Sequence, residues 1–452
     1  MAQAQKRSLI IEANEAVDKE ITLQGWVRLR RDHGKLIFLD IRDRSGIIQV
    51  VVNPMVSQEA HKAAQELRAE DVVEITGKVN KRPDSAINKV LETGGVELEA
   101  IAVKVLSKAE TLPFDMGSDS LNLELPTLLD FRTLTLRHPK VAKIFKVQEA
   151  LIEGFRKAAH KRDCTEIFVP TISASSTEGG AEVFRFKYYE NQAFLIQSPQ
   201  LYKQMMVGIF ERVFLTSHVY RAEESVTTRH LSESIQMDFE VGFINDFAEL
   251  LDFMEEAYSE MIEYAQENCS KEFKSLGVEK AKVSKKIPRV TLREAQEIIF
   301  KRTGVDHRQE LDLMPEDEKE IAAWGLEEHD SDLVTITHFP TKKRAFYSKP
   351  DPKDPEYSLS FDLLFKGLEI VSGAQRIDDY NELSEVIKKR GMDPKDFGMY
   401  LMAFRYGMPP HGGFSCGLER ATMKLLNLAN IREASLFPRD MERVDERFSK
   451  RE

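Results

Sequence analysis

A polar loop at 219–233, with the sequence VYRAEESVTTRHLSE, is the first candidate site for chemistry. Its charged and titratable side chains include Arg221, Glu223, Arg229 and His230. Arginine presents a planar fork to phosphate oxygens, and a nearby carboxylate can orient the arginine or bind a metal or an amine. We therefore interpret the loop as a candidate polyphosphate site, with a salt-bridged surface hairpin as the alternative.

A second candidate is the apolar segment 360–376, SFDLLFKGLEIVSGAQR. Its polar members are Asp362, Glu369, Ser372 and Arg376. Polar groups among Phe, Leu, Ile and Val are costly to bury unless they are bonded or used. Carboxylate and hydroxyl oxygens suit Mg²⁺, which often shares carboxylates with substrate phosphates. A purely structural pair between a carboxylate and Arg376 is the alternative.

Two further segments have the composition of ligand sites. In 409–426, PPHGGFSCGLERATMKLL, a glycine-rich turn enters a predicted helix, whose start favours anions. In QSPQLYK, Gln200 and Lys203 are three residues apart near the start of another predicted helix, so they share one face. A lysine together with the guanidinium of Arg376 suits a carboxylate better than an amide.

The elements that must position these residues begin with a small N-terminal domain, 1–106. Five short alternating segments predict strands there, with one helix between the third and the fourth, which is the order of an OB-type β-barrel. The expected strands are 21–29, 36–41, 47–52, 72–79 and 96–105, and the expected helix is 57–69. The stretch 107–130 contains Pro, Gly, Ser and Asp without a sustained apolar period, and it predicts a hinge.

Residues 131–452 form the expected large domain. Strands and helices alternate there without the regular pattern of a parallel sheet, which predicts an α+β fold with an antiparallel sheet flanked by helices. The expected elements include helices at 139–161, 199–206 and 246–267, a strand at 165–170, a hairpin at 182–196, and strands at 212–221 and 234–244.

Composition sets outer limits on the class of protein. The chain has 452 residues, a formal net charge of -11 and 42% hydrophobic residues, which is typical of a globular protein. Its three cysteines are too few for a disulfide framework and favour a reducing compartment. The apolar runs fall short of the roughly 20 residues that cross a bilayer, and the first residues lack a signal-peptide pattern. We expect a soluble, cytoplasmic protein with no membrane segment.

Taken together, these segments resemble the signature motifs of class II aminoacyl-tRNA synthetases. The helix and strand that end at Pro170 resemble motif 1, YRAE at 220–223 resembles motif 2, and GLER at 417–420 resembles motif 3. TEGG, QSPQLYK, TRHL, GAQR and LFPRD resemble the aspartyl-tRNA synthetase family, and GWVRLRRDHGKLIFLDIRD resembles its anticodon-binding OB domain. No large extra domain fits between the strands near 244 and 360, so the layout resembles the compact archaeal and eukaryotic type.

This resemblance implies an enzyme that activates L-aspartate with ATP to aspartyl-adenylate and then charges tRNA(Asp). Neither step needs a protein nucleophile, and the expected catalytic residues are Arg221, Arg420 and Glu369. The implied ATP site comprises Arg221, Glu223, Arg229, His230, Leu231, Glu369, Gly417, Leu418, Glu419 and Arg420. The implied aspartate site comprises Glu178, Gln200, Lys203, Asp238, Ser372, Arg376 and His411. The implied cofactor is Mg²⁺, with Glu369, Ser372 and Asp362 as its ligands.

Several of these residues have a more specific implied role. Arg221 would bind the α-phosphate, and His230 or Arg229, with Arg420, the outer phosphates. Lys203 and Arg376 would bind the side-chain carboxylate of aspartate, Asp238 its α-ammonium, and Glu178 would lie on a mobile loop that closes over it. Family members often have an aromatic residue near Ser234 that stacks on adenine. Either another aromatic takes over here, or ATP is held mainly through backbone and phosphate contacts.

The resemblance also implies partners. The expected anticodon contacts are Arg31, Phe38 and Gln49, within a segment, 24–49, in which basic residues outnumber acidic ones. Phe38 as part of the barrel core is the alternative. Motif 1 implies a homodimer. Whether tRNA(Asn) is charged as well as tRNA(Asp) is left open by the sequence.

Three rival functions share parts of this pattern. An asparaginyl-tRNA synthetase has the same architecture, but Lys203 would then face an amide without an ionic partner. A non-catalytic RNA-binding protein descended from a synthetase predicts losses at Arg221, Glu369, Ser372 and Arg420, all of which are present. A ligase that makes an amide from aspartyl-adenylate and ammonia would leave the OB-type domain without a purpose.

Overall fold

The structure is a computed structural model that describes residues 7–174, 182–224 and 226–448. The chain divides into two compact units, Met1–Glu124 and Leu125–Glu452. Glu178, which the sequence analysis assigned to the aspartate site, lies outside the described residues.

The first unit is the predicted closed β-barrel, with strands joined in the order β1-β2-β3-β5-β4. Alternate residues such as Ile37, Leu39 and Ile41 point inward and are buried, which explains the period-two pattern of the sequence. The barrel elements are β1 (Glu20–His33), β2 (Leu36–Asp43), β3 (Gly46–Val52), α1 (Gln58–Gln65), β4 (Val72–Lys81) and β5 (Val96–Ser107).

Residues 108–124 also belong to the first unit, because they bond to the barrel. The backbone N–H of Ala109 donates to Asp71 Oδ1 at 2.6 Å, and Arg28 Nη2 donates to the carbonyl of Gly117 at 3.4 Å. The second unit begins with the short helices α2 (Leu125–Asp130) and α3 (Arg132–Thr135). The boundary between the units therefore lies inside the expected hinge, 107–130.

A large sheet organises the second unit, and within the described residues its strand order is β12-β13-β14-β15-β16-β11-β10-β6. The interior pairs are antiparallel, as predicted, whereas the outermost pairs, β12 with β13 and β10 with β6, are parallel. A parallel pair needs a long crossover, and α8 (Leu292–Thr303) and α9 (Pro315–His329) supply one between β12 and β13. The strands are β6 (Thr165–Glu166), β10 (Arg212–Tyr220), β11 (Glu233–Gly242), β12 (Arg289–Thr291), β13 (Leu333–Thr337), β14 (Ser360–Phe365), β15 (Glu369–Gln375) and β16 (His411–Gly417).

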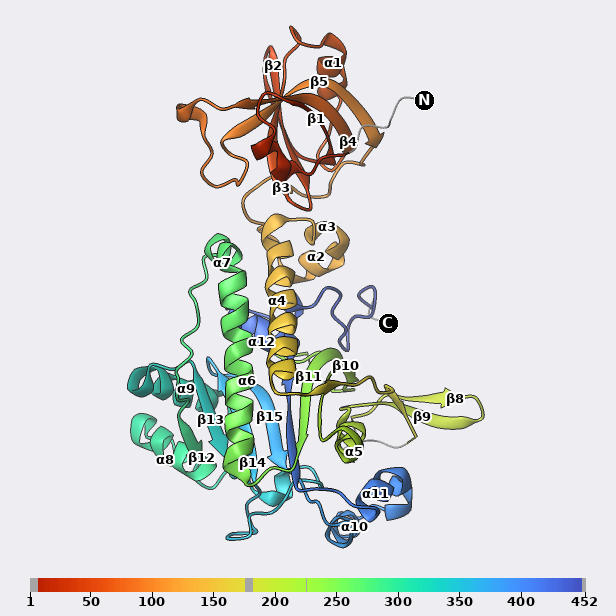
Figure 1. Ribbon diagram of the computed structural model, residues 1–452, viewed down its shortest axis with the longest axis vertical. Helices are drawn as coiled ribbons and strands as arrows, with labels where there is room; N and C mark the ends of the chain where they lie inside the picture. Colours follow the sequence, from red (N-terminus) through yellow and green to blue (C-terminus); the bar gives the residue numbers. More distant parts are fainter. Residues whose placement is uncertain (1–6, 175–181, 225, 449–452) are drawn as a thin grey trace. The chain divides into compact units, whose positions relative to one another are not determined.

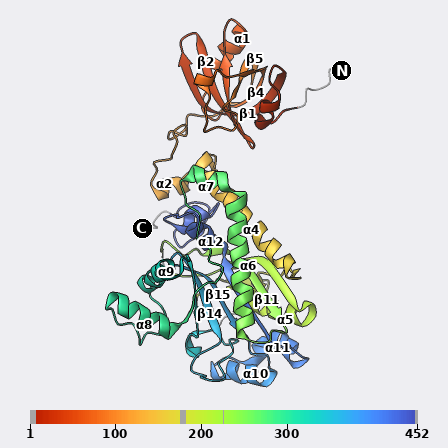
Figure 2. The same cartoon turned by 60° about the vertical axis from the view of Figure 1, so that its left-hand side comes forward.

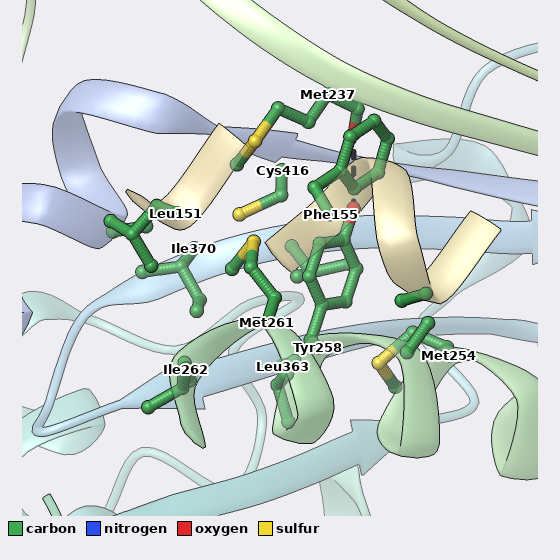
Figure 3. Packing of buried hydrophobic residues seen from close by; sticks show 14 of the residues in the cluster. Leu151, Phe155, Met237, Met254, Tyr258, Met261, Ile262, Leu363, Ile370 and Cys416 are labelled. Atoms are coloured by element: carbon green, nitrogen blue, oxygen red, sulfur yellow. Dashed lines mark hydrogen bonds between the residues drawn. The ribbon is translucent and has the colours of Figure 1, made fainter. Parts of the chain in front are cut away.

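Two long helices, α4 (Pro139–Lys161) and α6 (Phe247–Asn268), lie side by side against this sheet (Figures 1 and 2). Their apolar faces bury Phe155, Met254 and Tyr258 completely against the strands. The hydroxyl of Tyr258 donates to the carbonyl of Met237 on β11 at 3.0 Å (Figure 3). Burying each large side chain contributes about 2 kcal/mol, so this core holds β11 firmly at the centre of the sheet.

Smaller elements surround the ends of the strands. The predicted hairpin is confirmed as β8 and β9, which join β7 in a second small sheet. Helices α10 and α11 lie beside each other (Figures 1 and 2). The remaining elements are β7 (Ile172–Ser173), β8 (Arg185–Tyr188), β9 (Asn191–Leu195), α5 (Gln200–Phe210), α7 (Ser270–Leu276), α10 (Tyr380–Lys389), α11 (Gly398–Arg405) and α12 (Leu418–Leu425). In the part of the chain that the structure describes, no helix has the length and apolar character needed to cross a membrane.

Candidate active site

A polar cavity of about 320 Å³ opens over the centre of the large sheet. Its walls come from α5, β11, β15, β16 and α12 together with the loop after β10 and the loop before β14. The predicted site residues that line it are Gln200, Lys203, Arg221, Glu223, Arg229, His230, Leu231, Glu369, Ser372, Arg376, Gly417, Glu419 and Arg420. Four segments that are distant in sequence therefore bring their cations into one cavity.

Lys203, on α5, is held by a buried ionic cluster at one end of the cavity. Its ammonium donates to Asp238 Oδ1 at 2.8 Å and to the carbonyls of Phe239 and Phe414, each at 3.2 Å. A second carboxylate, Glu240, lies 3.4 Å from Nζ. These three hydrogen bonds use all the donors of the ammonium, so Lys203 already has ionic partners in the protein. The prediction that Lys203 would have no ionic partner if the substrate were asparagine is therefore wrong.

Arg376, which follows β15, shares Glu240 with Lys203. Its Nε donates to Glu240 Oε1 at 2.9 Å, and its Nη2 donates to the carbonyl of Gly413 at 2.8 Å and to Gln200 Oε1 at 3.1 Å. Nη1 has no hydrogen-bond partner among the described residues and is left for a ligand. A Cβ at Gly413 would lie 2.0 Å from Glu240 Oε2, which explains the glycine there.

The pKa values of the two carboxylates in this cluster are shifted in opposite directions. Burial raises the pKa of Asp238 above its ordinary value despite Lys203. Burial also acts to raise the pKa of Glu240, but Arg376 and Lys203 together outweigh it and lower the pKa below its ordinary value. Asp238 is fully buried and accepts a hydrogen bond from Ser415 Oγ at 3.1 Å, so it lies behind the cavity wall. Ser415 and Gln236 are the polar groups that reach the cavity in front of it.

His411 lies behind the same end of the cavity and is fully buried. Its Nδ1 is 2.9 Å from the carbonyl of Pro409, and its Nε2 is 3.0 Å from the amide nitrogen of Gln204. Burial lowers the pKa of His411, which fits a neutral ring that donates from Nδ1 and accepts at Nε2. Gln204 in turn accepts from Gln200 at 2.9 Å and from the hydroxyl of Tyr400 at 3.1 Å. His411 thus orients Gln200 through Gln204.

The opposite end of the cavity carries cations suited to phosphates. Arg221 follows β10, and its half-buried side chain forms no hydrogen bond or ion pair with any described residue. Arg420, in the first turn of α12, donates to the carbonyl of Glu369 at 3.1 Å. Arg229 is held by Glu318 at 3.2 Å. Burial lowers the pKa of His230, which accordingly favours its neutral form.

Carboxylates crowd beside these cations. Arg344 donates to Asp362 Oδ2 at 2.6 Å and to Ser372 Oγ at 3.0 Å, whereas Asp362 Oδ1 is buried and has no partner in the described chain. Burial and the neighbouring Glu369 raise the pKa of Asp362, and burial raises the pKa of Glu318 to about 7. No group of three or more His, Cys, Asp or Glu side chains in the described segments could hold a metal alone. An unpartnered carboxylate oxygen beside Glu369 nevertheless fits a divalent cation that takes its other ligands from phosphate.

Glu419 offers a test of the electrostatics of this cavity. It is almost fully buried, both carboxylate oxygens accept from the backbone N–H of Ile235 at 3.1 and 3.2 Å, and burial raises its pKa to about 7 from an ordinary 4.5. The folded protein therefore binds this proton more tightly than the unfolded chain, and the resulting stability is lost as the pH rises from 4.5 to 7.

We expect Glu419→Gln to raise the free energy of unfolding by about 1 to 3 kcal/mol at pH 8, because the amide needs no costly ionisation. Below the ordinary pKa both chains carry a neutral side chain and the difference should vanish. Denaturant unfolding of the two proteins across the pH range measures this. A variant that is less stable than the parent at pH 8 would contradict it.

On the barrel, the predicted anticodon residues lie on the outer face. Phe38 is half-buried, points away from the inward-facing Ile37 and Leu39, and meets His33 edge-on at 5.5 Å, so it is not part of the barrel core. Arg31 pairs with Phe38 in register and donates to Asp40 at 2.8 Å and to Gln49 at 3.4 Å. The basic excess predicted for this segment is partly neutralised, since Arg42 also pairs with Glu70 at 2.6 Å.

Sequence reasoning missed several residues of both surfaces. At the cavity, Gln236 and Arg344 line it, whereas Gln204, Glu240, Glu318 and Tyr400 are outside the lining and hold its residues in place. On the barrel the missed residue is Glu97, which accepts a hydrogen bond from Gln49. Glu240 had a detectable signal, because it lies two residues after Asp238 on one strand and must share its face. Gln236 and Gln204 had a similar signal, because Gln236 lies two residues before Asp238 on the same strand and Gln204 lies four residues after Gln200 on the same helix. The remaining residues come from segments whose proximity only the fold creates.

Comparison with known proteins agrees with this arrangement. Residues 124–441 match the model of tRNA synthetases class II (D, K and N), and residues 21–106 match that of the OB-fold nucleic acid binding domain. The chain is 41% identical to the aspartate–tRNA(Asp/Asn) ligase of Thermus thermophilus over 97% of this chain and 99% of that protein. It is 40% identical to the aspartate–tRNA(Asp) ligase of Pyrococcus horikoshii over 94% of this chain and 96% of that protein.

Solved structures show the same architecture. The asparaginyl-tRNA synthetase of Pyrococcus horikoshii, complexed with asparaginyl-adenylate, superposes with a TM-score of 0.89 at 33% identity, covering 97% of this chain and 99% of that one. A putative aspartyl-tRNA synthetase of Leishmania major superposes with a TM-score of 0.88 at 27% identity, covering 98% and 96%. With one family model spanning most of the second unit and relatives matched almost end to end, the chain belongs to the class II tRNA synthetases of the D, K and N group.

Proposed function

We propose that this protein is a cytoplasmic aspartate–tRNA ligase, which forms aspartyl-adenylate from L-aspartate and ATP and transfers the aspartyl group to the 3′ end of tRNA(Asp). The observation that carries the proposal is the cavity itself: Lys203 and Arg376 at one end, and Arg221, Arg229 and Arg420 at the other. A dicarboxylic amino acid beside a nucleoside triphosphate fits this distribution of charge. The names of the relatives at about 40% identity support the same substrate.

In the first step the α-carboxylate of aspartate attacks the α-phosphorus of ATP. A carboxylate-to-phosphorus bond forms, the bond to the β-phosphate oxygen breaks, and pyrophosphate leaves with the electron pair. The protein supplies position and charge, and no side chain needs to become covalently attached. Arg221 is the cation best placed to neutralise charge that develops at the α-phosphate, because it has no partner to give up among the described residues.

At the amino-acid end, the free Nη1 of Arg376 donates to the side-chain carboxylate, and the charge of Lys203 favours the same group. An asparagine amide would gain less from two cations, although the likeness to an asparaginyl-tRNA synthetase structure keeps asparagine as the second candidate. Because Asp238 is enclosed, we place the α-ammonium against Ser415 and Gln236, with Asp238 acting through Ser415.

Mg²⁺ is the divalent cation that we assign to Glu369 and Ser372, with Asp362 behind them. When bound there with ATP, it would neutralise phosphate charge. The protein's own contribution is to keep Asp362 and Ser372 in place through Arg344. Ser234 lines the cavity without an aromatic ring, and we infer that adenine is held by the apolar side chains of Leu231 and Ile431 and by backbone groups.

On the barrel we propose that Arg31, Phe38 and Gln49 contact the anticodon, with Phe38 as the stacking ring. Purified tRNA(Asp) and tRNA(Asn) distinguish the two charging ranges: charging of tRNA(Asp) alone indicates a specific enzyme, and charging of both indicates a broader one.

The test of the proposed function is ATP–pyrophosphate exchange with aspartate and with asparagine. Exchange that depends on aspartate supports the proposal. Exchange only with asparagine would establish the rival synthetase, and no exchange with either would favour a non-catalytic RNA-binding protein. Formation of free asparagine from ammonia without tRNA would indicate the amide-forming ligase.

We also propose that two copies of the chain form a homodimer through the edge of the sheet at β6. Phe168, just after this two-residue strand, is 84% exposed, and Ile172 is 42% exposed. Exposed apolar side chains beside a sheet edge are typical of an interface.

Phe168→Asp is therefore expected to weaken dimerisation about 100-fold, because a charge would replace a central aromatic anchor. Sedimentation velocity at micromolar concentration measures the change. Tyr189→Asp, at an equally exposed turn between β8 and β9, serves as the matched control and should remain dimeric. A parent chain that sediments as a monomer would contradict the homodimer.

A further inference from the structure

A second cavity, of about 520 Å³, lies on the other side of the segment 340–350 from the cavity assigned to aspartate and ATP. Its floor is apolar: Phe346 and Ile377 are buried beneath it, and Val386 of α10 forms one side. The volume is in the range that holds a drug-sized molecule. The face is distinct from the catalytic cavity, although Ser348 contributes to both.

The rim of this cavity is cationic. Lys342 and Lys389 are exposed, and their ammonium groups form no hydrogen bond or ion pair of at most 4.0 Å with the described residues. Arg293 and Arg390 also line the cavity. Glu356 is the only carboxylate in the lining that the structure describes. Apolar walls with several convergent cations match a molecule that combines a ring or branched aliphatic body with one anionic group.

The segment 340–350 forms a common wall. Its residues divide between the two cavities: Arg344 and Tyr347 line the catalytic cavity, whereas Phe346 and Pro350 line the second one. Arg390, just after α10, holds this segment by donating to the carbonyls of Thr341 at 2.8 Å and Arg344 at 2.9 Å. Arg344 in turn bonds to Asp362 and Ser372 in the catalytic cavity.

From this geometry we propose that the second cavity is a binding site for a small aromatic or branched aliphatic anion, and that its occupancy is coupled to the catalytic cavity through the segment 340–350. An anion at the rim competes with the backbone carbonyls for Arg390. Release of those carbonyls loosens Arg344, so the bound anion should lower the affinity for ATP.

The probe is 1-anilinonaphthalene-8-sulfonate, an aromatic sulfonate whose fluorescence rises on binding. N-phenyl-1-naphthylamine has the same rings without the anion and serves as the matched ligand. We expect Val386→Trp, which fills the cavity, to abolish binding of both probes at this site. Lys342→Glu combined with Lys389→Glu changes only exposed residues; it should weaken the sulfonate about fivefold or more and leave the uncharged amine unchanged.

Binding of the sulfonate that is equal in the parent and in Val386→Trp would overturn the site, and equal binding in the charge-reversed variant would overturn its preference for anions. Thermal unfolding of each variant confirms that it is folded during the titration.

The coupling between the two cavities is measured as the dissociation constant for ATP. Saturating sulfonate should raise this constant about fivefold in the parent and not in Val386→Trp. An unchanged constant in the parent would overturn the coupling. The probe titrations do not depend on the assignment of aspartate as the substrate. If aspartate-dependent exchange is absent, probe binding can still be measured, and the reverse also holds.

Discussion

Replacing Lys203 with leucine is expected to lower aspartate-dependent ATP–pyrophosphate exchange about 1000-fold or more. The ammonium is shared by Asp238 at 2.8 Å and Glu240 at 3.4 Å, and all three groups are buried. Without it, these acidic groups lose their common cation, and the side-chain carboxylate of aspartate meets a more negative pocket. Exchange measured at varied aspartate and fixed ATP reports this loss.

If Lys203 serves the amino-acid end of the cavity, its replacement should impair the use of aspartate and not the binding of ATP. Calorimetric titration with ATP should therefore stay within about threefold of the parent, and thermal unfolding must show that the variant is folded at the assay temperature. Lys301→Leu is the matched control: it makes the same replacement on the exposed face of α8, where the lysine pairs among the described residues only with Glu297, at 3.4 Å. It should retain full exchange. Unchanged exchange in Lys203→Leu would remove the lysine from the aspartate site. An equal loss of ATP binding would show that it only holds the cavity together.

The fold followed from the sequence where one periodicity dominated. The barrel strands alternate buried and solvent-facing residues, as in Ile37, Phe38 and Leu39, so their number and order could be predicted. The large sheet was predicted as antiparallel, which is correct for its interior. Its two parallel edges depend on long crossovers, through α8 and α9 for β12 and β13 and through residues 167–211 for β6 and β10, and the sequence pattern of these regions did not indicate a topology.

The sequence predicted most of the cations of the candidate site, but few of the groups that bond to these cations. Arg376 and Lys203 lie in recognisable segments, but their shared partner is Glu240, and Arg344 reaches Asp362 from a loop with no motif. Such pairs are decided by strand register: β11 lies between β10 and β16, which places Glu240 opposite Gly413. A single sequence gives the faces of a strand but not its neighbours, so the ionic cluster could not be derived before the sheet order.

Arg221→Gln is expected to lower the kcat of aspartate-dependent exchange about 100- to 1000-fold, with a smaller change in the KM for aspartate. The reason is that a cation matters most where charge develops in the transition state. Arg221 lines the phosphate end of the cavity with no partner among the described residues, so its whole charge is available to the ATP phosphates. Glutamine keeps a hydrogen-bond donor of similar length but removes that charge.

A comparison with Arg229, in the same cavity, separates a direct contact of Arg221 with the α-phosphate from a general effect of positive charge. Arg229 must first give up Glu318, which it meets at 3.2 Å, so Arg229→Gln should cost about tenfold only. Arg212→Gln lies at the other end of β10, where the arginine donates to the carbonyl of Arg162 at 3.3 Å, and it should leave exchange unchanged. Equal losses at positions 221 and 229 would show that the cavity needs only net positive charge. If Arg221→Gln lowers kcat less than about tenfold, another group must contact the α-phosphate. The next candidate is Arg420, which is also an arginine but already donates to the carbonyl of Glu369.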